Sequence, residues 1–300
     1  MILISIGGTT SSGKSQLARI ALNYLVKKNL KVKIINCDSR QIYKGLTVSS
    51  GVDIQADAGV SLIGKFNLEN RVSVVDYLKK FIREIVTEKP FLDVVILVGG
   101  TGMYSKAITD KYKLTETRPE FQKDFDKLEI KLESQSKEQL QNLLQEIDLG
   151  AFNLLNNSDK NNPRRLKNSI LRITGYKKSW YSYLEVPEFT KTVKFWTQIN
   201  ETSKCIKIEE NLENRIKNSM VEEIMSLIQS YGTDRVKELG LGYRYGVDLF
   251  NKNINFQEWR DLTLKSEIQY AKRQVTWLKN QNGYIIDSPE TFLFYIDTIL

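Results

Sequence analysis

A glycine-rich stretch near the N-terminus carries residue types that bind phosphate. Gly8-Thr9-Thr10-Ser11-Ser12-Gly13-Lys14-Ser15 fits G-x-x-x-x-G-K-[ST] in full, and it lies between an expected strand and an expected helix. In such a P-loop the backbone N–H groups turn inward around phosphate oxygens, the helix N-terminus adds partial positive charge and the lysine adds a full charge. We therefore expect Lys14 and its neighbours to hold a phosphorylated substrate, with the Ser15 hydroxyl able to bind Mg²⁺.

The carboxylate that ordinary P-loop NTPases carry on a later strand is missing from its usual place. The apolar run 94–98 ends in Gly99-Gly100-Thr101-Gly102, whereas Asp38 follows the strand expected at 32–36. Ligands of open α/β sheets bind at the carboxyl ends of the strands, so Asp38 and Thr101 are expected to converge on the P-loop. A phosphate cradle, one carboxylate and one hydroxyl suggest a diphosphate leaving group and a proton removed from an acceptor.

Composition excludes several kinds of catalytic site. The chain has no histidine, which rules out a histidine base, a Ser-His-Asp triad and histidine metal ligands. Cys37 and Cys205 form no C-x-x-C pair, so neither a disulfide framework nor a zinc site is expected. The net charge of +8 suits a polyanionic partner such as nucleic acid, although solubility alone explains it equally well.

The elements that must position these residues alternate along the first hundred residues. Residues 2–6, 32–36 and 94–98 are typical of strands, while 13–28 and 74–85 repeat apolar residues at helical spacing. Continuous apolar strands suit a parallel sheet covered by helices on both faces. The fold class expected is therefore α/β, a P-loop core with a parallel sheet flanked by helices.

The composition changes after residue 112. Residues 113–192 are mostly charged and helix-forming, which predicts a mostly helical insertion domain between two parts of the core, 1–112 and 193–300. Within the second part, 194–197 returns to a strand, and helical patterns follow near 204–230, 233–250 and 255–281. No apolar run approaches the ~20 residues of a membrane helix and no signal peptide is recognisable, so a cytoplasmic protein without a membrane partner is expected.

Four motifs occur in an order and spacing that resemble one known family. After the P-loop come Asp38-Ser39-Arg40-Gln41-Ile42-Tyr43-Lys44-Gly45-Leu46, then Gly99-Gly100-Thr101-Gly102-Met103-Tyr104, and finally Ala271-Lys272-Arg273-Gln274-Val275-Thr276-Trp277. Together they resemble the bacterial tRNA dimethylallyltransferases, and the resemblance spans residues 2 to about 288. Weaker matches are Pro163-Arg164-Arg165-Leu166 and Gly242-Tyr243-Arg244.

The resemblance implies a reaction and its substrates. A dimethylallyl group would pass from dimethylallyl diphosphate to the exocyclic amino group of the adenine 3′ of the tRNA anticodon, flipped from its stack. By family position Asp38 is the general base, Thr101 helps to hold the adenine, and Lys14 neutralises the leaving diphosphate. The diphosphate would bind to Gly8, Thr9, Thr10, Ser11, Ser12, Gly13, Lys14 and Ser15, with Mg²⁺ on Ser15. The tRNA would contact Asp38, Ser39, Arg40, Gln41, Thr101, Arg164, Arg165, Lys167, Lys272 and Arg273. A monomer is expected.

Two departures from the family remove positive charge. Ile268, preceded by Glu267, stands where the family has an arginine that supports the diphosphate, and Val52 stands where it has a lysine. Ser50 can replace a family hydroxyl nearby. Our hypothesis is that Lys65, Lys265 or Arg244 supplies replacement charge.

Three other functions remain open. The chain could prenylate a free adenine nucleotide, which AMP in competition with tRNA would reveal. It could be a P-loop kinase or NTPase, although this leaves Thr101 and Lys272-Arg273-Gln274 unexplained. It could also bind tRNA without catalysis because of Ile268 and Val52.

Overall fold

The fold was analysed in a computed structural model, which describes residues 1–52, 59–88, 91–110, 114–179, 181–197 and 201–300, with the side chains of 201 and 202 excluded. The chain divides into two compact units, Met1–Tyr112 with Val186–Leu300, and Lys113–Glu185. The boundary predicted between 112 and 113 lies outside the described residues. The boundary predicted at 192 is wrong, because it falls inside a strand of the first unit's sheet.

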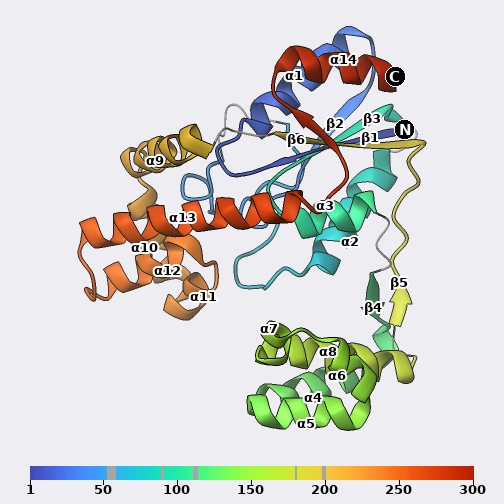
Figure 1. Cartoon of the computed structure of the whole chain (residues 1–300), viewed down its shortest axis with the longest axis vertical. Helices are drawn as coiled ribbons and strands as arrows, with labels where there is room; N and C mark the ends of the chain where they lie inside the picture. The colour runs from blue at the N-terminus through green and yellow to red at the C-terminus, as the bar shows by residue number, and fades with distance from the viewer. Residues whose placement is uncertain (53–58, 89–90, 111–113, 180, 198–200) are drawn as a thin grey trace. The chain divides into compact units, whose positions relative to one another are not determined.

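One parallel sheet organises the first unit (Figure 1). Its strand order is β2-β3-β1-β6-β7, so the N-terminal strand lies at the centre. Ile4 of the central strand lies opposite Ile96 on one side and Val193 on the other. The continuous apolar runs are buried because helices cover both faces of the sheet. The strands are β1 (Ile2–Gly8), β2 (Val32–Asn36), β3 (Val94–Val98), β6 (Lys191–Thr197) and β7 (Tyr284–Ile286).

Helices lie on both faces of this sheet, as the α/β prediction requires (Figure 1). One face is covered by α1 (Lys14–Lys27) and α14 (Pro289–Ile299), whose apolar sides share a core with Ile4 and Phe195. The other face is covered by α2 (Val74–Glu88) and α3 (Gly102–Thr109). The predicted P-loop core is therefore confirmed, whereas β7 and α14 carried no prediction.

The region after β6 holds more helices than the sequence patterns predicted. The pattern at 204–230 divides at Ser219, whose φ of +69° cannot continue a helix. That at 233–250 divides before Gly240, whose φ is +71°. The helices are α9 (Glu201–Lys217), α10 (Met220–Tyr231), α11 (Thr233–Lys237), α12 (Leu241–Phe250) and α13 (Phe256–Leu278).

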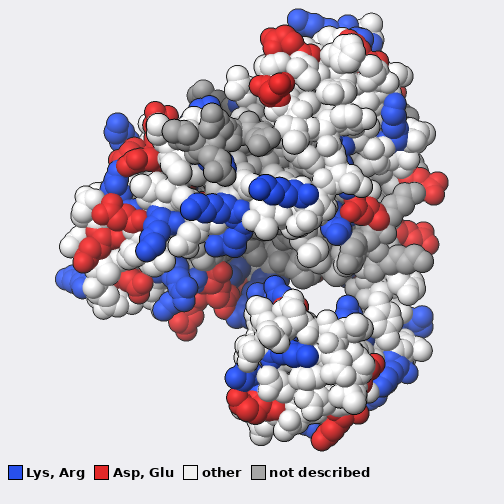
Figure 2. All heavy atoms as spheres, viewed as in Figure 1, with Lys and Arg blue, Asp and Glu red and all other residues white. Residues whose placement is uncertain are grey.

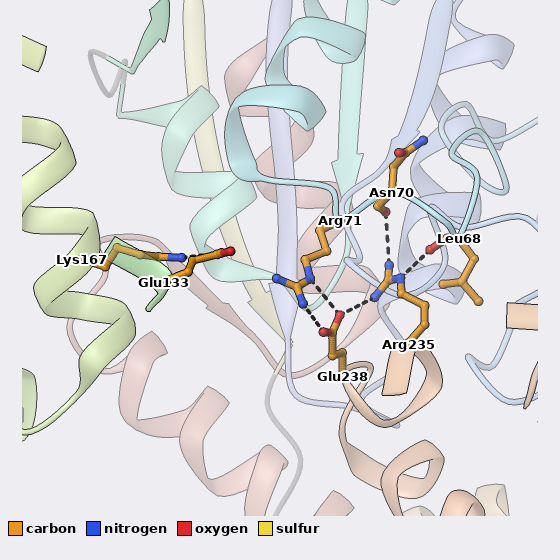
Figure 3. A network of polar contacts seen from close by, with 7 residues as sticks. All are labelled: Leu68, Asn70, Arg71, Glu133, Lys167, Arg235 and Glu238. Atoms are coloured by element: carbon orange, nitrogen blue, oxygen red, sulfur yellow. Dashed lines mark hydrogen bonds and ion pairs between the residues drawn. The ribbon is translucent and has the colours of Figure 1, made fainter. Parts of the chain in front are cut away.

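An ion-pair network fastens α11 to the chain that precedes α2 (Figure 3). Arg235 donates to the carbonyl of Leu68 at 2.5 Å and to that of Asn70 at 3.2 Å. Glu238 accepts from Arg235 at 3.2 Å and from Nε of Arg71 at 2.9 Å. These contacts stabilise the segment that leads from the Asp38 region to α2.

The second unit is a helical bundle with its own small core, built around Leu132, Leu144 and Leu166. A capping box at Ser136 and Gln139 begins one helix, and Asn162 with Pro163 begins the longest. Lys167 pairs with Glu133 at 2.9 Å within this unit (Figure 3). The elements are β4 (Thr115–Thr117), a 3-10 turn (Pro119–Phe121), α4 (Gln122–Glu133), α5 (Lys137–Ile147), α6 (Leu149–Leu154), α7 (Asn157–Lys160), α8 (Pro163–Lys177) and β5 (Tyr181–Tyr183).

Among the residues that the structure describes, no helix combines the length and the apolar character that crossing a bilayer demands.

Candidate active site

A cavity of about 780 Å³ lies at the carboxyl ends of β1, β2 and β3. The P-loop, Asp38 and Gly99 reach it directly after these strands, as the sheet topology requires. Two segments from the C-terminal half complete its wall, one on α9 with Arg215 and one on α13 with Gln274. The cavity therefore joins residues that are distant in the sequence.

The P-loop forms the cradle that its sequence predicts. Gly13 has φ of +81° and Ser11 has φ of +60°, which turn the chain sharply before α1. Ser12 donates to the carbonyl of Thr9 at 2.7 Å, and Asn211 of α9 donates to the Ser11 hydroxyl at 2.8 Å. The residues from Thr10 to Ser15 line the cavity. The N-terminus of α1 thus begins at the cavity wall.

Gly8 and Thr9 lie behind this cradle rather than on the cavity wall. A Cβ at Gly8 would lie 2.0 Å from the hydroxyl of Thr197, so only glycine fits there. Thr9 is 3% exposed, and its carbonyl accepts from Nζ of Lys14 at 2.5 Å. Both residues shape the P-loop from behind.

Lys14 is held in an environment that disfavours its charge. Burial lowers the pKa of Lys14 from 10.5 to about 8, and the Asp38 carboxylate opposes this shift. A bound anion would favour the protonated lysine. Affinity for a diphosphate should therefore be linked to the protonation of Lys14.

We expect the affinity for dimethylallyl diphosphate to fall as the pH rises through about 8, by up to about tenfold per pH unit. Below that pH the free protein already carries the Lys14 proton, whereas above it binding must recruit one. Titration calorimetry from pH 7 to 9.5 in two buffers of different ionisation enthalpy measures this proton uptake. The Lys14→Met variant should bind weakly without the step, and an equal step in that variant would contradict the assignment to Lys14.

Asp38 is oriented by the turn that follows β2. Its Oδ1 accepts from the backbone N–H of Arg40 at 2.9 Å and, more weakly, from that of Gln41 at 3.5 Å. Oδ2 accepts no such bond within the described chain, and Asp38 lines the cavity together with Lys14. One carboxylate oxygen is thus occupied by the backbone while the other can accept a proton.

The glycines after β3 allow the chain to pass close to Asp38. A Cβ at Gly99 would lie 2.2 Å from the Cys37 carbonyl oxygen, and one at Gly100 would lie 2.7 Å from Nε2 of Gln274. Thr101 donates its N–H to the Cys37 carbonyl at 3.1 Å, and its hydroxyl accepts from the N–H of Ser39 at 2.9 Å. Thr101 therefore joins the two strand ends and lies beside the cavity lining rather than in it.

Gln274 connects the P-loop to the glycine turn. Its Oε1 accepts from the N–H of Thr10 at 2.9 Å, and its Nε2 donates to the carbonyl of Gly100 at 3.1 Å. Tyr270, Gln274 and Trp277 recur at i, i+4 and i+7, so they share one face of α13, which its sequence pattern alone would assign to packing. Tyr270 and Gln274 in fact line the cavity, so the same face both packs and forms the site.

The ring of Tyr270 also lies close to the guanidinium groups of two arginines predicted to bind tRNA. The guanidinium carbons of Arg40 and Arg273 lie 5.6 and 5.8 Å from the centre of its ring. Arg40 further donates to the Ser39 hydroxyl at 3.1 Å and to the carbonyl of Leu239 at 3.0 Å. Of the Ser39-Arg40-Gln41 run, only Gln41 lines the cavity itself.

The basic residues of the cavity differ from those proposed as replacements. Lys65, Lys265 and Arg244 are not among the residues that line it, so the hypothesis that one of them supplies replacement charge stays a prediction. Ile268 likewise lies in a separate hollow of α13. The arginines that do line the cavity are Arg19 and Arg215. No local motif marks either of them, because each is brought there by helix packing.

Arg215 and Arg19 present their charges differently. Arg215 forms a two-pronged ion pair with Glu267, at 2.7 and 2.6 Å, so its charge is largely compensated. Arg19 lies one turn beyond Ser15 and donates from Nε to the Ser15 carbonyl at 3.4 Å. It has no acidic partner in the described part of the chain, which leaves its guanidinium available to an anion.

The remaining residues predicted to bind tRNA are far from the P-loop in the sequence. Arg164, Arg165 and Lys167 belong to α8 of the second unit, where Arg165 pairs with Asp159. Lys272 and Arg273 are exposed on α13 of the first unit. Figure 2 shows basic side chains in a row over α13, which suits contact with phosphates.

A Mg²⁺ ion at the P-loop would need oxygen donors from the chain. Mg²⁺ is usually held by one or two protein oxygens together with substrate phosphates and waters. The Ser15 hydroxyl lines the cavity and makes no hydrogen bond within the described chain. The described residues contain no cluster of three or more metal-binding side chains. This donor set fits a Mg²⁺ ion bound mainly by substrate, with Ser15 as the protein contact.

The chain is similar to known sequences over most of its length. The family model described as IPP transferase matches residues 41–281. The tRNA dimethylallyltransferase of Prochlorococcus marinus (strain MIT 9312) is 27% identical over 288 residues, covering 94% of this chain and 91% of that protein. The tRNA dimethylallyltransferase 2 of Shewanella sediminis (strain HAW-EB3) is 28% identical over 280 residues, covering 92% and 88%.

Solved structures have the same fold. The tRNA isopentenylpyrophosphate transferase of Bacillus halodurans is similar with a TM-score of 0.66 at 22% identity, covering 99% of this chain and 95% of that one. A eukaryotic dimethylallyltransferase acting on tRNA has a TM-score of 0.70 at 20% identity, covering 92% and 69%. Since the family match spans well over half of its length, the chain belongs to the IPP transferase family.

Proposed function

We propose that this protein transfers a dimethylallyl group from dimethylallyl diphosphate to the exocyclic amino group of the adenine 3′ of the anticodon in tRNA. The observation that carries the proposal is one cavity that contains both the P-loop with Lys14 and the half-free carboxylate of Asp38, in a member of the IPP transferase family. We propose a monomer acting in the cytoplasm, where its tRNA substrate is found.

The P-loop side of the cavity would bind the donor. As the bond between the prenyl C1 and the diphosphate oxygen breaks, negative charge grows on the diphosphate. Lys14, the N–H groups that begin α1 and the guanidinium of Arg19 are placed to stabilise that charge. Mg²⁺ bound at Ser15 would neutralise further charge on the same leaving group.

Asp38 would serve the acceptor. The amino group of adenine is a poor nucleophile, so a carboxylate that takes its proton assists formation of the new C–N bond. The backbone N–H of Arg40 fixes Oδ1, which leaves Oδ2 as the proton acceptor. Base and leaving-group contacts thus lie in one cavity, as a direct displacement requires.

The alternative functions are not favoured. A kinase or NTPase would need a carboxylate at the end of a later strand, whereas β3 ends in Gly99 and Gly100. Relatives across the length of the chain are named tRNA dimethylallyltransferases rather than nucleotide prenyltransferases. A binding protein without catalysis would lack a working site, yet the cavity is lined by Asp38, Lys14 and Arg19, and Arg19 forms no ion pair with any acidic residue that the structure describes.

Arg164 is expected to contribute more to tRNA binding than its basic neighbours. Arg165 is paired with Asp159 and Lys167 with Glu133, while Arg164 is exposed with no ion pair in the described chain. Arg164→Gln should make the negative slope of log affinity against log salt less steep by about 0.7 to 0.9, with smaller changes for Arg165→Gln and Lys167→Gln. Filter binding of tRNA at about 50 to 300 mM salt measures this slope, with Arg83→Gln, at an exposed position on α2, as the control.

The function itself is tested by transfer of labelled dimethylallyl from its diphosphate to unmodified tRNA with Mg²⁺. Labelled tRNA that AMP does not outcompete supports the proposal. Preferential labelling of AMP would instead show a nucleotide prenyltransferase, and ATP turnover without a prenyl donor would show an NTPase. Binding of tRNA without any product would show a protein that has lost catalysis.

A further inference from the structure

The cavity lining includes aliphatic residues that differ chemically from the P-loop. Val48, Val52, Val60 and Ile63 line it, and all four are half-buried. We call these four residues the aliphatic wall. The P-loop offers N–H groups, hydroxyls and a basic side chain, so the lining combines anion-binding groups with hydrocarbon groups.

The segment that carries Val48 and leads to Val52 is attached to α10 by a single carboxylate. Glu223 accepts from three consecutive backbone N–H groups, those of Thr47 at 3.2 Å, Val48 at 2.9 Å and Ser49 at 3.0 Å. It also accepts from the Thr47 hydroxyl at 2.6 Å and from the Ser49 hydroxyl. Consecutive N–H groups that point at one anion form a concave binding site, here filled by the protein's own carboxylate.

Further bonds fix the same segment from α9, from α12 and from the turn that follows β2. Arg215 of α9 donates to the Ser49 carbonyl at 3.0 Å, and Gln41 donates to the carbonyls of Ser50 at 3.2 Å and Gly51 at 3.4 Å. Ser49 is 4% exposed and donates to the hydroxyl of Tyr243 at 2.8 Å. With its backbone groups occupied, the segment cannot withdraw from the cavity without breaking several hydrogen bonds, most of them partly buried.

We propose that the aliphatic wall receives the hydrocarbon tail of the donor, and that Glu223 is the positioning residue that sets its distance from the P-loop. This inference rests on the proposed function and goes beyond it by assigning the part of the site that recognises the prenyl chain.

The physical reason is the two-part nature of a prenyl diphosphate. Its diphosphate binds to N–H groups and cations, whereas each methylene or methyl group gains about 0.8 kcal/mol when it leaves water for an apolar surface. A wall at a fixed distance also limits how long a tail can be while C1 stays near Asp38. Displacement of reacting atoms by about 1 Å can lower a rate by about 10²-fold.

Binding of two alkyl diphosphates to the full chain tests the wall. Methyl diphosphate and dimethylallyl diphosphate carry the same anion but differ in their tails. The Kd of methyl diphosphate divided by the Kd of dimethylallyl diphosphate is expected to fall about threefold to tenfold in Val48→Ala and in Glu223→Gln. The fall should come from weaker binding of dimethylallyl diphosphate, with the Kd of methyl diphosphate nearly unchanged. Matched controls are Val26→Ala, exposed on α1, and Glu222→Gln, exposed beside Glu223 on α10. Neither control should change the ratio.

An unchanged ratio in both Val48→Ala and Glu223→Gln would overturn the proposal. So would an equal loss of affinity for both ligands, because that would mean a general effect on the P-loop. Val48→Ala keeps the test valid should Glu223→Gln fail to fold. The binding experiment needs no tRNA, so its result would hold even if the chain did not transfer a prenyl group to tRNA. Conversely, tail recognition by the aliphatic wall could fail in a chain that still transfers the prenyl group.

The length of the tail gives a second readout that a purely structural role would not move. Val48→Ala should raise the kcat/KM of geranyl diphosphate relative to that of dimethylallyl diphosphate by about threefold to tenfold, because a shortened wall admits the longer tail. A constant ratio would contradict the assignment.

Discussion

Replacement of Asp38 by Asn is expected to lower kcat for prenyl transfer by about 10²- to 10⁴-fold, the usual contribution of a positioned general base. The asparagine oxygen can still accept from the N–H of Arg40, so the turn after β2 should keep its shape. What the variant loses is the carboxylate oxygen that is free to take the adenine proton. Asn therefore separates the chemical role of Asp38 from its structural one better than Ala does.

The measurement is single-turnover transfer of labelled dimethylallyl to tRNA, with tRNA affinity determined in parallel. Affinity should stay within about threefold of the natural chain, since an amide preserves the size and the hydrogen bond of the aspartate. Asp287→Asn, at an exposed position after β7, is the charge-matched control and should leave kcat unchanged. A kcat for Asp38→Asn close to the natural value would place the base elsewhere.

Replacement of Lys14 by Met should lower kcat/KM for dimethylallyl diphosphate by about 10²- to 10³-fold. The methionine fills similar space but carries no charge, so the leaving diphosphate loses its strongest side-chain contact. Enclosure of Lys14, which lowers its pKa to about 8, also means that little water can replace the missing charge. We expect both a higher KM for the donor and a lower kcat.

Steady-state kinetics with saturating tRNA measures both constants. Lys27→Met, at the exposed end of the same helix α1, removes an equal charge away from the cavity and should be indistinguishable from the natural chain. The affinity for tRNA should be unaffected in either variant. A change confined to tRNA affinity would contradict the placement of Lys14 on the donor.

The positions of Ile268 and Val52 in the structure bear on the two departures from the family that suggested a weakened site. Ile268 lines a hollow of α13 that is separate from the cavity. Val52 lies on the cavity, among aliphatic neighbours.

The local parts of this protein could be predicted from its sequence because each depends on neighbouring residues. The P-loop needs only glycines, a lysine and a serine at set spacing between a strand and a helix. The strands at 32–36 and 94–98 are continuous apolar runs, and the structure has them at these bounds. Asp38 could be placed near the P-loop because parallel strands end at one edge of a sheet.

Contacts between distant segments were decided only by the tertiary structure. Gln274 meets the N–H of Thr10, and Arg215 reaches Ser49 and Glu267, because α13 and α9 pack beside the sheet. The breaks at Ser219 and Gly240 were also missed, since apolar periodicity continues across residues whose backbone turns away. A sequence pattern reports which face of a segment is buried, but not which other segment buries it. That choice depends on the packing free energy of the whole chain, and it also brought Arg19, Arg215 and the aliphatic wall to one cavity.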